Sequence, residues 1–142
     1  MSTQDNLTIA QSIYTAFSQG DIPAILNVLT DDVEFHEPPG GAPPFTGTYR
    51  GRDGAGMFFQ KMVGAVDVLM LEPQEFVAQG DTVVVLGHYR FRPKATGVAY
   101  DTDWAMVWWF RDGKISKFQI HYDTATERLA FQSLATREVV GG

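Results

Sequence analysis

The sequence lacks cysteine altogether, which excludes disulfide bonds and thiolate chemistry. It contains 11 lysine and arginine residues against 17 acidic ones, so its formal net charge is −6. No run of basic residues is present either, which argues against a nucleic-acid-binding surface and a polybasic membrane contact. No apolar stretch resembles a signal-peptide core or a membrane span. We therefore expect a cytoplasmic protein that binds neither nucleic acid nor membrane.

Aromatic residues, in contrast, are abundant, with ten Phe, five Tyr and three Trp in 142 residues. A chain of this length predicts a single domain over residues 1–142 that buries roughly two thirds of its unfolded surface. The ring area exceeds what a core of this size usually needs. Part of it is therefore expected to line a pocket for a small apolar or aromatic ligand.

The hydrophobic pattern places helices first and strands second. Helical spacing predicts helices over about residues 6–19, 21–30 and 53–63, with Asp21 and Asp53 as caps. Period-two alternation predicts strands near residues 67–79, 81–93, 98–111 and 114–123. Asp112-Gly113 is the clearest hairpin signal between them. A last helix follows from Asp123 or Thr124, where Thr124 to Glu127 has the spacing of a capping box.

This order predicts an α+β fold in which a curved antiparallel sheet forms a cone around N-terminal helices. One face of the expected sheet is aromatic and uncharged, and the other mixes apolar, charged and histidine positions. The mixed face favours a homodimer that packs sheet against sheet. The predicted ligand-binding residues come from the aromatic face and the helices: Phe17, Met57, Phe58, Tyr89, Phe91, Trp104, Met106, Phe118 and Tyr122.

Residues 31–51 contain the first candidate for chemistry. Val33, Phe35 and Glu37 share one face of a short strand, which Pro38 stops. The apolar face therefore ends in a carboxylate. Burial there disfavours the charge of Glu37 and raises its pKa toward neutrality, as a general acid or base requires. The alternative interpretation is a solvated glutamate at an exposed strand end.

Several short motifs of this chain together resemble a known superfamily. They are Gly20-Asp21, Asp31-Asp32-Val33, His36-Glu37-Pro38, Tyr49-Arg50-Gly51, Phe110 to Ile115, and Tyr122 to Ala125. In order and spacing they are similar to the nuclear transport factor 2-like superfamily, and within it to the SnoaL-like polyketide cyclase and ketosteroid isomerase group. The resemblance covers nearly the whole chain and implies a cystatin-like fold. Proteins of that fold include isomerases, cyclases, dehydratases, epoxide hydrolases and non-catalytic binders.

The resemblance also implies residue roles. Glu37 occupies the position of the general-base carboxylate of ketosteroid isomerases. The isomerase's oxyanion-hole tyrosine corresponds to Ile13, with Tyr14 one residue away and pointing elsewhere unless the helix is rotated, and its protonated aspartate corresponds to Met106. Loss of one such donor typically lowers the rate by about 10²–10³. Asp123 lies where acids act as catalysts in some SnoaL-like cyclases, although its own alternation points it outward as a helix cap.

Two functions follow from these residues. The first is a small enzyme without cofactor or metal, in which Glu37 transfers a proton and a donor such as Tyr14 steadies the developing enolate. Asp123 is a further catalytic candidate. The second is a binding module that has the pocket and no chemistry. The three histidines share no metal-like spacing on one element, which favours a structural or interface role for them.

Overall fold

The computed structural model describes residues 2–39 and 45–141 of the chain, with side chains up to residue 132. Its elements in order are α1 (Thr3–Ser18), α2 (Ile22–Leu26), β1 (Leu29–Glu37), β2 (Gly47–Arg50), α3 (Gly51–Ala65), β3 (Val66–Gln79), β4 (Thr82–Pro93), β5 (Tyr100–Arg111), β6 (Lys114–Tyr122) and α4 (Thr124–Gly141). The predicted order of helices and strands is therefore confirmed except for β2, which was not predicted. No helix within the described ranges combines the length and apolar character that crossing a bilayer requires.

The strands form one six-stranded sheet in the order β2-β1-β6-β5-β4-β3. The three pairs among β3, β4, β5 and β6 are antiparallel, as predicted, and so is the pair of β1 with the unpredicted β2, but β1 and β6 run parallel. The prediction of a wholly antiparallel sheet is wrong at this pair, because the hairpin signals concern only strands joined by short turns. The parallel register places Phe35 beside Phe118, with ring centroids 4.9 Å apart.

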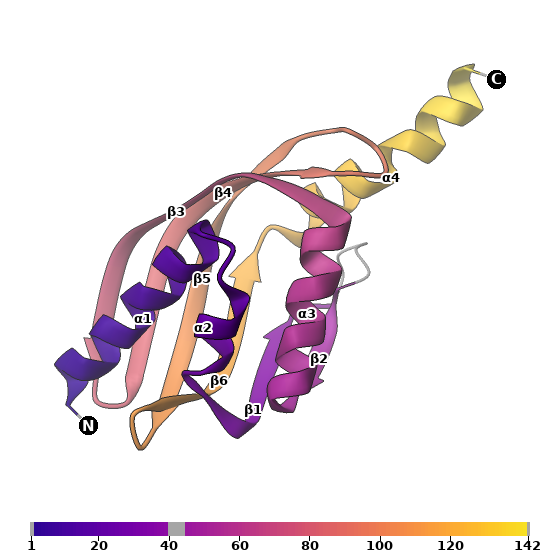
Figure 1. Ribbon diagram of the computed structural model, residues 1–142. Helices are drawn as coiled ribbons and strands as arrows, with labels where there is room; N and C mark the ends of the chain where they lie inside the picture. The colour runs from indigo at the N-terminus through magenta and orange to yellow at the C-terminus, as the bar shows by residue number, and fades with distance from the viewer. Residues whose placement is uncertain (1, 40–44, 142) are drawn as a thin grey trace.

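Helices α1, α2 and α3 lie on one face of the curved sheet, as Figure 1 shows. Helix α3 packs against β1 and β2, and α1 packs against β3 and β4. Helix α4 follows directly on β6, and its last turns extend away from the sheet (Figure 1). The predicted α+β fold, with a curved sheet around N-terminal helices, is confirmed.

The turns and caps differ in detail from the predictions. Asp112 and Gly113 have φ angles of 51° and 79°, as the two central residues of a type I′ hairpin require. Asp21 caps α2 by accepting a hydrogen bond from the backbone N–H of Ala24 at 3.2 Å. Asp53, in contrast, lies inside the first turn of α3, since that helix begins at Gly51. Strand β2 was not predicted, and residues 40–44 before it lie outside the described part of the chain.

The core lies between the helices and the inner face of the sheet. Val33, Phe35 and Glu37 of β1 are all buried on this face, as their alternation predicts. The same alternation buries the aromatic face of β4, β5 and β6. Six of these inner residues, all at most 5% exposed, are Tyr89, Phe91, Trp104, Trp108, Phe118 and Ile120.

Candidate functional site

A cavity of about 60 Å³ lies between α1, α3 and the inner face of the sheet. It has room for a few water molecules. Its walls are almost wholly apolar, and the polar side chains on them are Glu37 and three tyrosines: Tyr14, Tyr89 and Tyr122. Among the described residues, no lysine, arginine or histidine lines it. A negative charge inside this cavity therefore has no opposite charge on the described walls.

Glu37 is the last residue of β1 and is 7% exposed. It lies on the inner face because it continues the alternation of Val33 and Phe35, and Pro38 ends the strand immediately after it. Burial raises the pKa of the Glu37 carboxyl well above its ordinary value, and the nearby charge of Glu127 raises this pKa further. A hydroxyl hydrogen that Tyr122 directed at Glu37 would act in the opposite direction. Glu37 is therefore a carboxyl that the fold favours in its neutral form.

Glu127 is a second buried carboxyl at the same place, and it is 0% exposed. Its Oε1 accepts a hydrogen bond from the Tyr122 hydroxyl at 2.6 Å, and its Oε2 accepts one from the Tyr100 hydroxyl at 2.8 Å. The Tyr122 hydroxyl also lies 3.3 Å from Oε2 of Glu37. One tyrosine hydroxyl thus joins the two carboxyls.

Sequence analysis missed the role of Glu127, which it assigned to a capping box. Asp123, one of the two predicted caps, is the residue that caps α4, accepting hydrogen bonds from the backbone N–H of Thr126 at 3.1 Å and from its hydroxyl at 2.7 Å. These hydrogen bonds lower the pKa of Asp123. The prediction that places Asp123 in the site is wrong, since its carboxylate lies outside the cavity. A usable signal was present, because Ala130 and Phe131 follow Glu127 at helical spacing and share its inward side.

Tyr14 lines the cavity, contrary to the expectation that it points elsewhere. Its hydroxyl accepts a hydrogen bond from Trp108 Nε1 at 3.1 Å and lies 3.0 Å from the sulfur of Met106. Burial raises the pKa of the hydroxyl, so Tyr14 remains protonated. Because a thioether is a weak acceptor, the Tyr14 proton is available to a stronger one, such as a ligand oxygen.

Trp104 was predicted to bind the ligand but lies behind Tyr14, outside the cavity wall. The two rings stack with centroids 5.8 Å apart. The indole lies across Gly87 of the neighbouring strand, where a Cβ atom would come within 2.4 Å of it. Trp104 thus supports the ring of Tyr14 instead of contacting a ligand.

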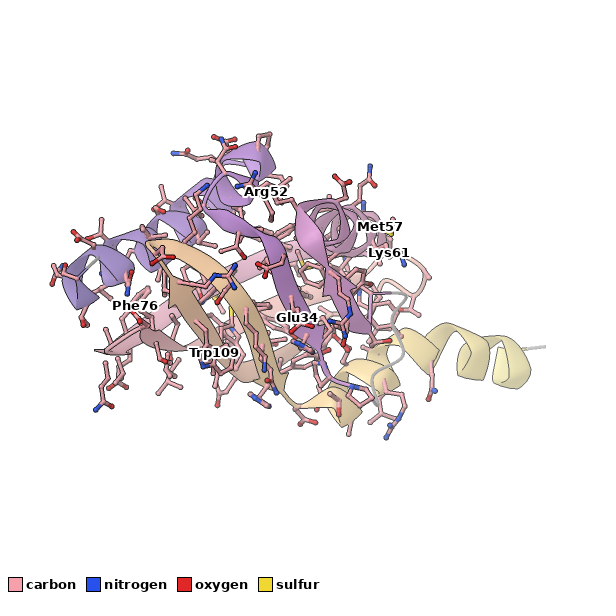
Figure 2. The ribbon with its side chains drawn as sticks, turned by 90° about the horizontal axis from the view of Figure 1, so that it is seen from below. Glu34, Arg52, Met57, Lys61, Phe76 and Trp109 are labelled. Atoms are coloured by element: carbon pink, nitrogen blue, oxygen red, sulfur yellow. The ribbon has the colours of Figure 1, made fainter. Side chains whose placement is uncertain are left out.

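Met57 is also wrongly predicted to line the cavity. It lies on the outside of α3 and is 51% exposed (Figure 2). The buried side of α3 is formed by Ala55, Phe58, Phe59 and Met62, whose spacing of three and four residues makes one helical stripe. Met57 falls off that stripe. The other predicted ligand-binding residues do line the cavity: Phe17, Phe58, Tyr89, Phe91, Met106, Phe118 and Tyr122.

Other polar groups lie apart from the cavity. Arg52 donates hydrogen bonds to the backbone carbonyl of Leu29, and Arg50 forms an ion pair with Glu34. His88, on the outer face of the sheet, lies 2.8 Å from Asp103 and 3.0 Å from Asp101. Within the described ranges, no group of three or more acidic or histidine side chains is arranged to hold a metal ion.

Comparisons with known proteins place this geometry in a family. The sequence model of the SnoaL-like domain family matches residues 10–118 of this chain. An NTF2-like protein from Burkholderia xenovorans is 34% identical, with a TM-score of 0.83 over 92% of this chain and 98% of that one. An NTF2-like protein of unknown function from Burkholderia pseudomallei is 31% identical, with a TM-score of 0.80 over 88% and 94%. TerC, co-crystallised with polyporic acid, is 30% identical, with a TM-score of 0.78 over 93% and 98%. No curated protein matches.

Proposed function

Because the chain belongs to the SnoaL-like domain family, we propose that it is a small enzyme that needs no cofactor and transfers a proton on an apolar, oxygenated ligand. The observation that carries this proposal is the position of Glu37. A carboxyl that is 7% exposed forms part of the wall of an otherwise apolar cavity. Such a group typically contributes about 10²–10⁴ to the rate of a proton transfer.

Tyr14 is the group we assign to the ligand oxygen. Its hydroxyl already accepts a hydrogen bond from Trp108, which makes it a better donor to a carbonyl oxygen. Tyr14 would then hold and polarise the ligand carbonyl by a hydrogen bond while Glu37 exchanges the proton. Isomerisation, cyclisation and dehydration all contain a step of this kind.

The ligand is expected to be neutral and flat, because aromatic rings line the cavity and no cation lines it among the described residues. A cavity of about 60 Å³ is smaller than the roughly 300–1,000 Å³ of typical ligand sites. Binding must therefore displace lining side chains. Met62 and Met106 are the most adaptable of these, since an unbranched thioether side chain changes rotamer easily.

Deuterium exchange at the α-carbon of 1-tetralone, a neutral two-ring ketone, tests the proposal. In D₂O, the wild-type protein is expected to accelerate the exchange over buffer, as followed by proton NMR. Glu37→Gln is expected to lower the acceleration by about 10²–10⁴. Glu75→Gln makes the same chemical change on exposed β3 and should match the wild type. Equal acceleration by wild type and Glu37→Gln contradicts the proposal.

A second candidate is a ligand-binding module, and a specific observation favours it. Ile13 and Met106, which stand where ketosteroid isomerases have their two oxyanion donors, both line the cavity. Quenching of tryptophan fluorescence by polyporic acid, the compound crystallised with TerC, provides a binding test. Saturable quenching that Glu37→Gln leaves intact, without exchange of 1-tetralone, supports the module.

The mixed outer face of the sheet leads us to propose that the protein forms a homodimer. Leu86 and Val77 are 37% and 50% exposed on neighbouring strands. Apolar side chains of this size on a sheet face are typical of a contact between subunits. The sedimentation mass at micromolar concentration tests this proposal.

A further inference from the structure

The two buried carboxyls have unequal sets of hydrogen-bond donors. Both oxygens of Glu127 are occupied, one by Tyr122 at 2.6 Å and the other by Tyr100 at 2.8 Å. Glu37 has one contact in this cluster, to the Tyr122 hydroxyl at 3.3 Å. A carboxylate that accepts two hydroxyl hydrogen bonds is stabilised in its charged form. Burial raises the pKa of Glu127, and these two hydrogen bonds lower it. Glu37 lacks such a pair of donors and also faces the charge of Glu127. Of the two groups, Glu127 is therefore the one that ionises first.

The Tyr122 hydroxyl has a single hydrogen and lies within reach of both carboxyls. The hydroxyl donates this hydrogen to Glu127, which is the nearer of the two carboxyls. The contact with Glu37 is then a hydrogen bond only when Glu37 supplies the proton. An ionised Glu37 would face the lone pairs of the hydroxyl and the charge of Glu127 across a buried space, which is strongly unfavourable.

Among the described residues, no charge resolved at either carboxyl changes this result. The titratable groups facing the pair from the packed elements are Tyr49 of β2, Tyr89 of β4, Tyr100 of β5 and Tyr122 of β6. Burial and the carboxyl charges raise the pKa values of these tyrosines, so their hydroxyls remain neutral. Within the described residues, no cationic side chain has its charge resolved as acting on either carboxyl.

We propose that Glu127 is a positioning residue: it accepts the hydrogen bond of the Tyr122 hydroxyl, which leaves the hydroxyl oxygen as an acceptor that holds Glu37 protonated at the cavity, so that the enzyme begins its reaction as an acid. The catalytic part of this inference rests on the proposed function, whereas the proton arrangement does not. It identifies the substrate as a molecule with a neutral, basic oxygen, such as a ketone.

The proton balance of the step closes without a co-reactant. The O–H bond of the Glu37 carboxyl breaks, and its proton bonds to a lone pair of the substrate carbonyl oxygen. Glu37 becomes a carboxylate, and Tyr122 keeps its own proton toward Glu127. The carboxylate then takes a proton from the substrate α-carbon, whose C–H electrons form the enol double bond. Glu37 is again protonated at the end, and the substrate has changed tautomer.

Carbon-13 NMR titration of glutamate carboxyls tests the arrangement without any substrate, with Glu37→Gln and Glu127→Gln assigning the two resonances. In the wild type, Glu127 is expected to ionise at lower pH than Glu37. In Glu127→Gln, the pKa of Glu37 is expected to fall, because the like charge has gone. Glu75→Gln removes an equal charge from exposed β3 and should leave the pKa of Glu37 where it is. A Glu37 titration that is the same in Glu127→Gln and the wild type overturns the inference.

Tyr100→Phe is the second variant, since it keeps the ring and removes one of the two donors to Glu127. It is expected to raise the pKa of Glu127 and bring the two titrations closer together. If the pKa values of Glu127 and Glu37 differ in Tyr100→Phe by as much as in the wild type, the inference is contradicted, even if Glu127→Gln does not fold.

The catalytic consequence has its own readout in the pH profile of 1-tetralone exchange. Activity should be lost as the pH rises past the pKa of Glu37, and Glu127→Gln should move this limb to lower pH. Exchange that depends on Glu37 while its titration ignores Glu127 overturns the inference and leaves the proposed function standing. If the titrations are as expected but no exchange of 1-tetralone occurs, the proton arrangement stands and the proposed function is contradicted.

Discussion

The Glu37→Gln substitution is expected to change how the stability of the protein depends on pH. Burial, and then the charge of Glu127, raise the pKa of Glu37 well above its ordinary value of 4.5. Above that pH, the unfolded chain loses the Glu37 proton while the folded protein keeps it. The free energy of unfolding of the wild type therefore falls as the pH rises through this window. The slope for one proton is at most about 1.4 kcal/mol per pH unit.

Glutamine does not ionise, so the variant lacks this part of the slope. We expect the two proteins to differ little near pH 4.5, and the variant to be the more stable of the two at pH 7–8. Urea unfolding followed by tryptophan fluorescence at each pH measures the difference. A loss of about 1.4 kcal/mol also lowers the melting temperature by roughly 3–6 °C in a domain of this size. Glu75→Gln should follow the wild type, and stability curves that run parallel for wild type and Glu37→Gln refute the reasoning.

Three further predictions concern the packing of the sheet, the cap of α4 and the proposed dimer. Gly87→Ala should lower the free energy of unfolding by about 1–3 kcal/mol in urea titrations, because its methyl group overlaps Trp104; Gly64→Ala in α3, where nothing lies within 4 Å, should be neutral or stabilising. Asp123→Ala should lower the free energy of unfolding by about 1 kcal/mol through the lost helix cap without moving the carboxyl titration of Glu37. Sedimentation should give the mass of two chains for the wild type and of one chain for Leu86→Lys, and a one-chain mass for the wild type contradicts the dimer.

Local sequence patterns predicted most of the fold because strands and turns are determined largely by neighbouring residues. Alternation in β1 and the glycine turn at Asp112-Gly113 act through neighbouring residues, so the sequence carries them directly. The start of α3 was misplaced because Asp53 looks like a cap but lies inside the first turn. Met57 was misplaced because its helix has apolar residues on two sides, and only packing against β1 and β2 decides which side is buried.

The site itself was predicted in part. Glu37 was found because strand alternation and the stop at Pro38 both point to it. The orientation of Tyr14 depends on the rotation of α1 over the sheet, which Trp108 and Trp104 determine through a hydrogen bond and a stacked ring. Such contacts join residues far apart in the chain. Glu127 was missed since a capping box and an inward-facing acid have the same local sequence.

The parallel pairing of β1 with β6 explains why the acid cluster exists at all. Parallel neighbours end at the same edge of a sheet, so the last residues of both strands, Glu37 and Tyr122, meet although they are 85 positions apart in the chain. The chain then passes directly from Tyr122 into α4, whose first turn brings Glu127 back onto the same hydroxyl. Had β1 paired in the antiparallel direction, Glu37 would lie at the opposite edge, where β6 begins. A single long-range pairing therefore converts a buried glutamate into a carboxyl with a defined proton partner.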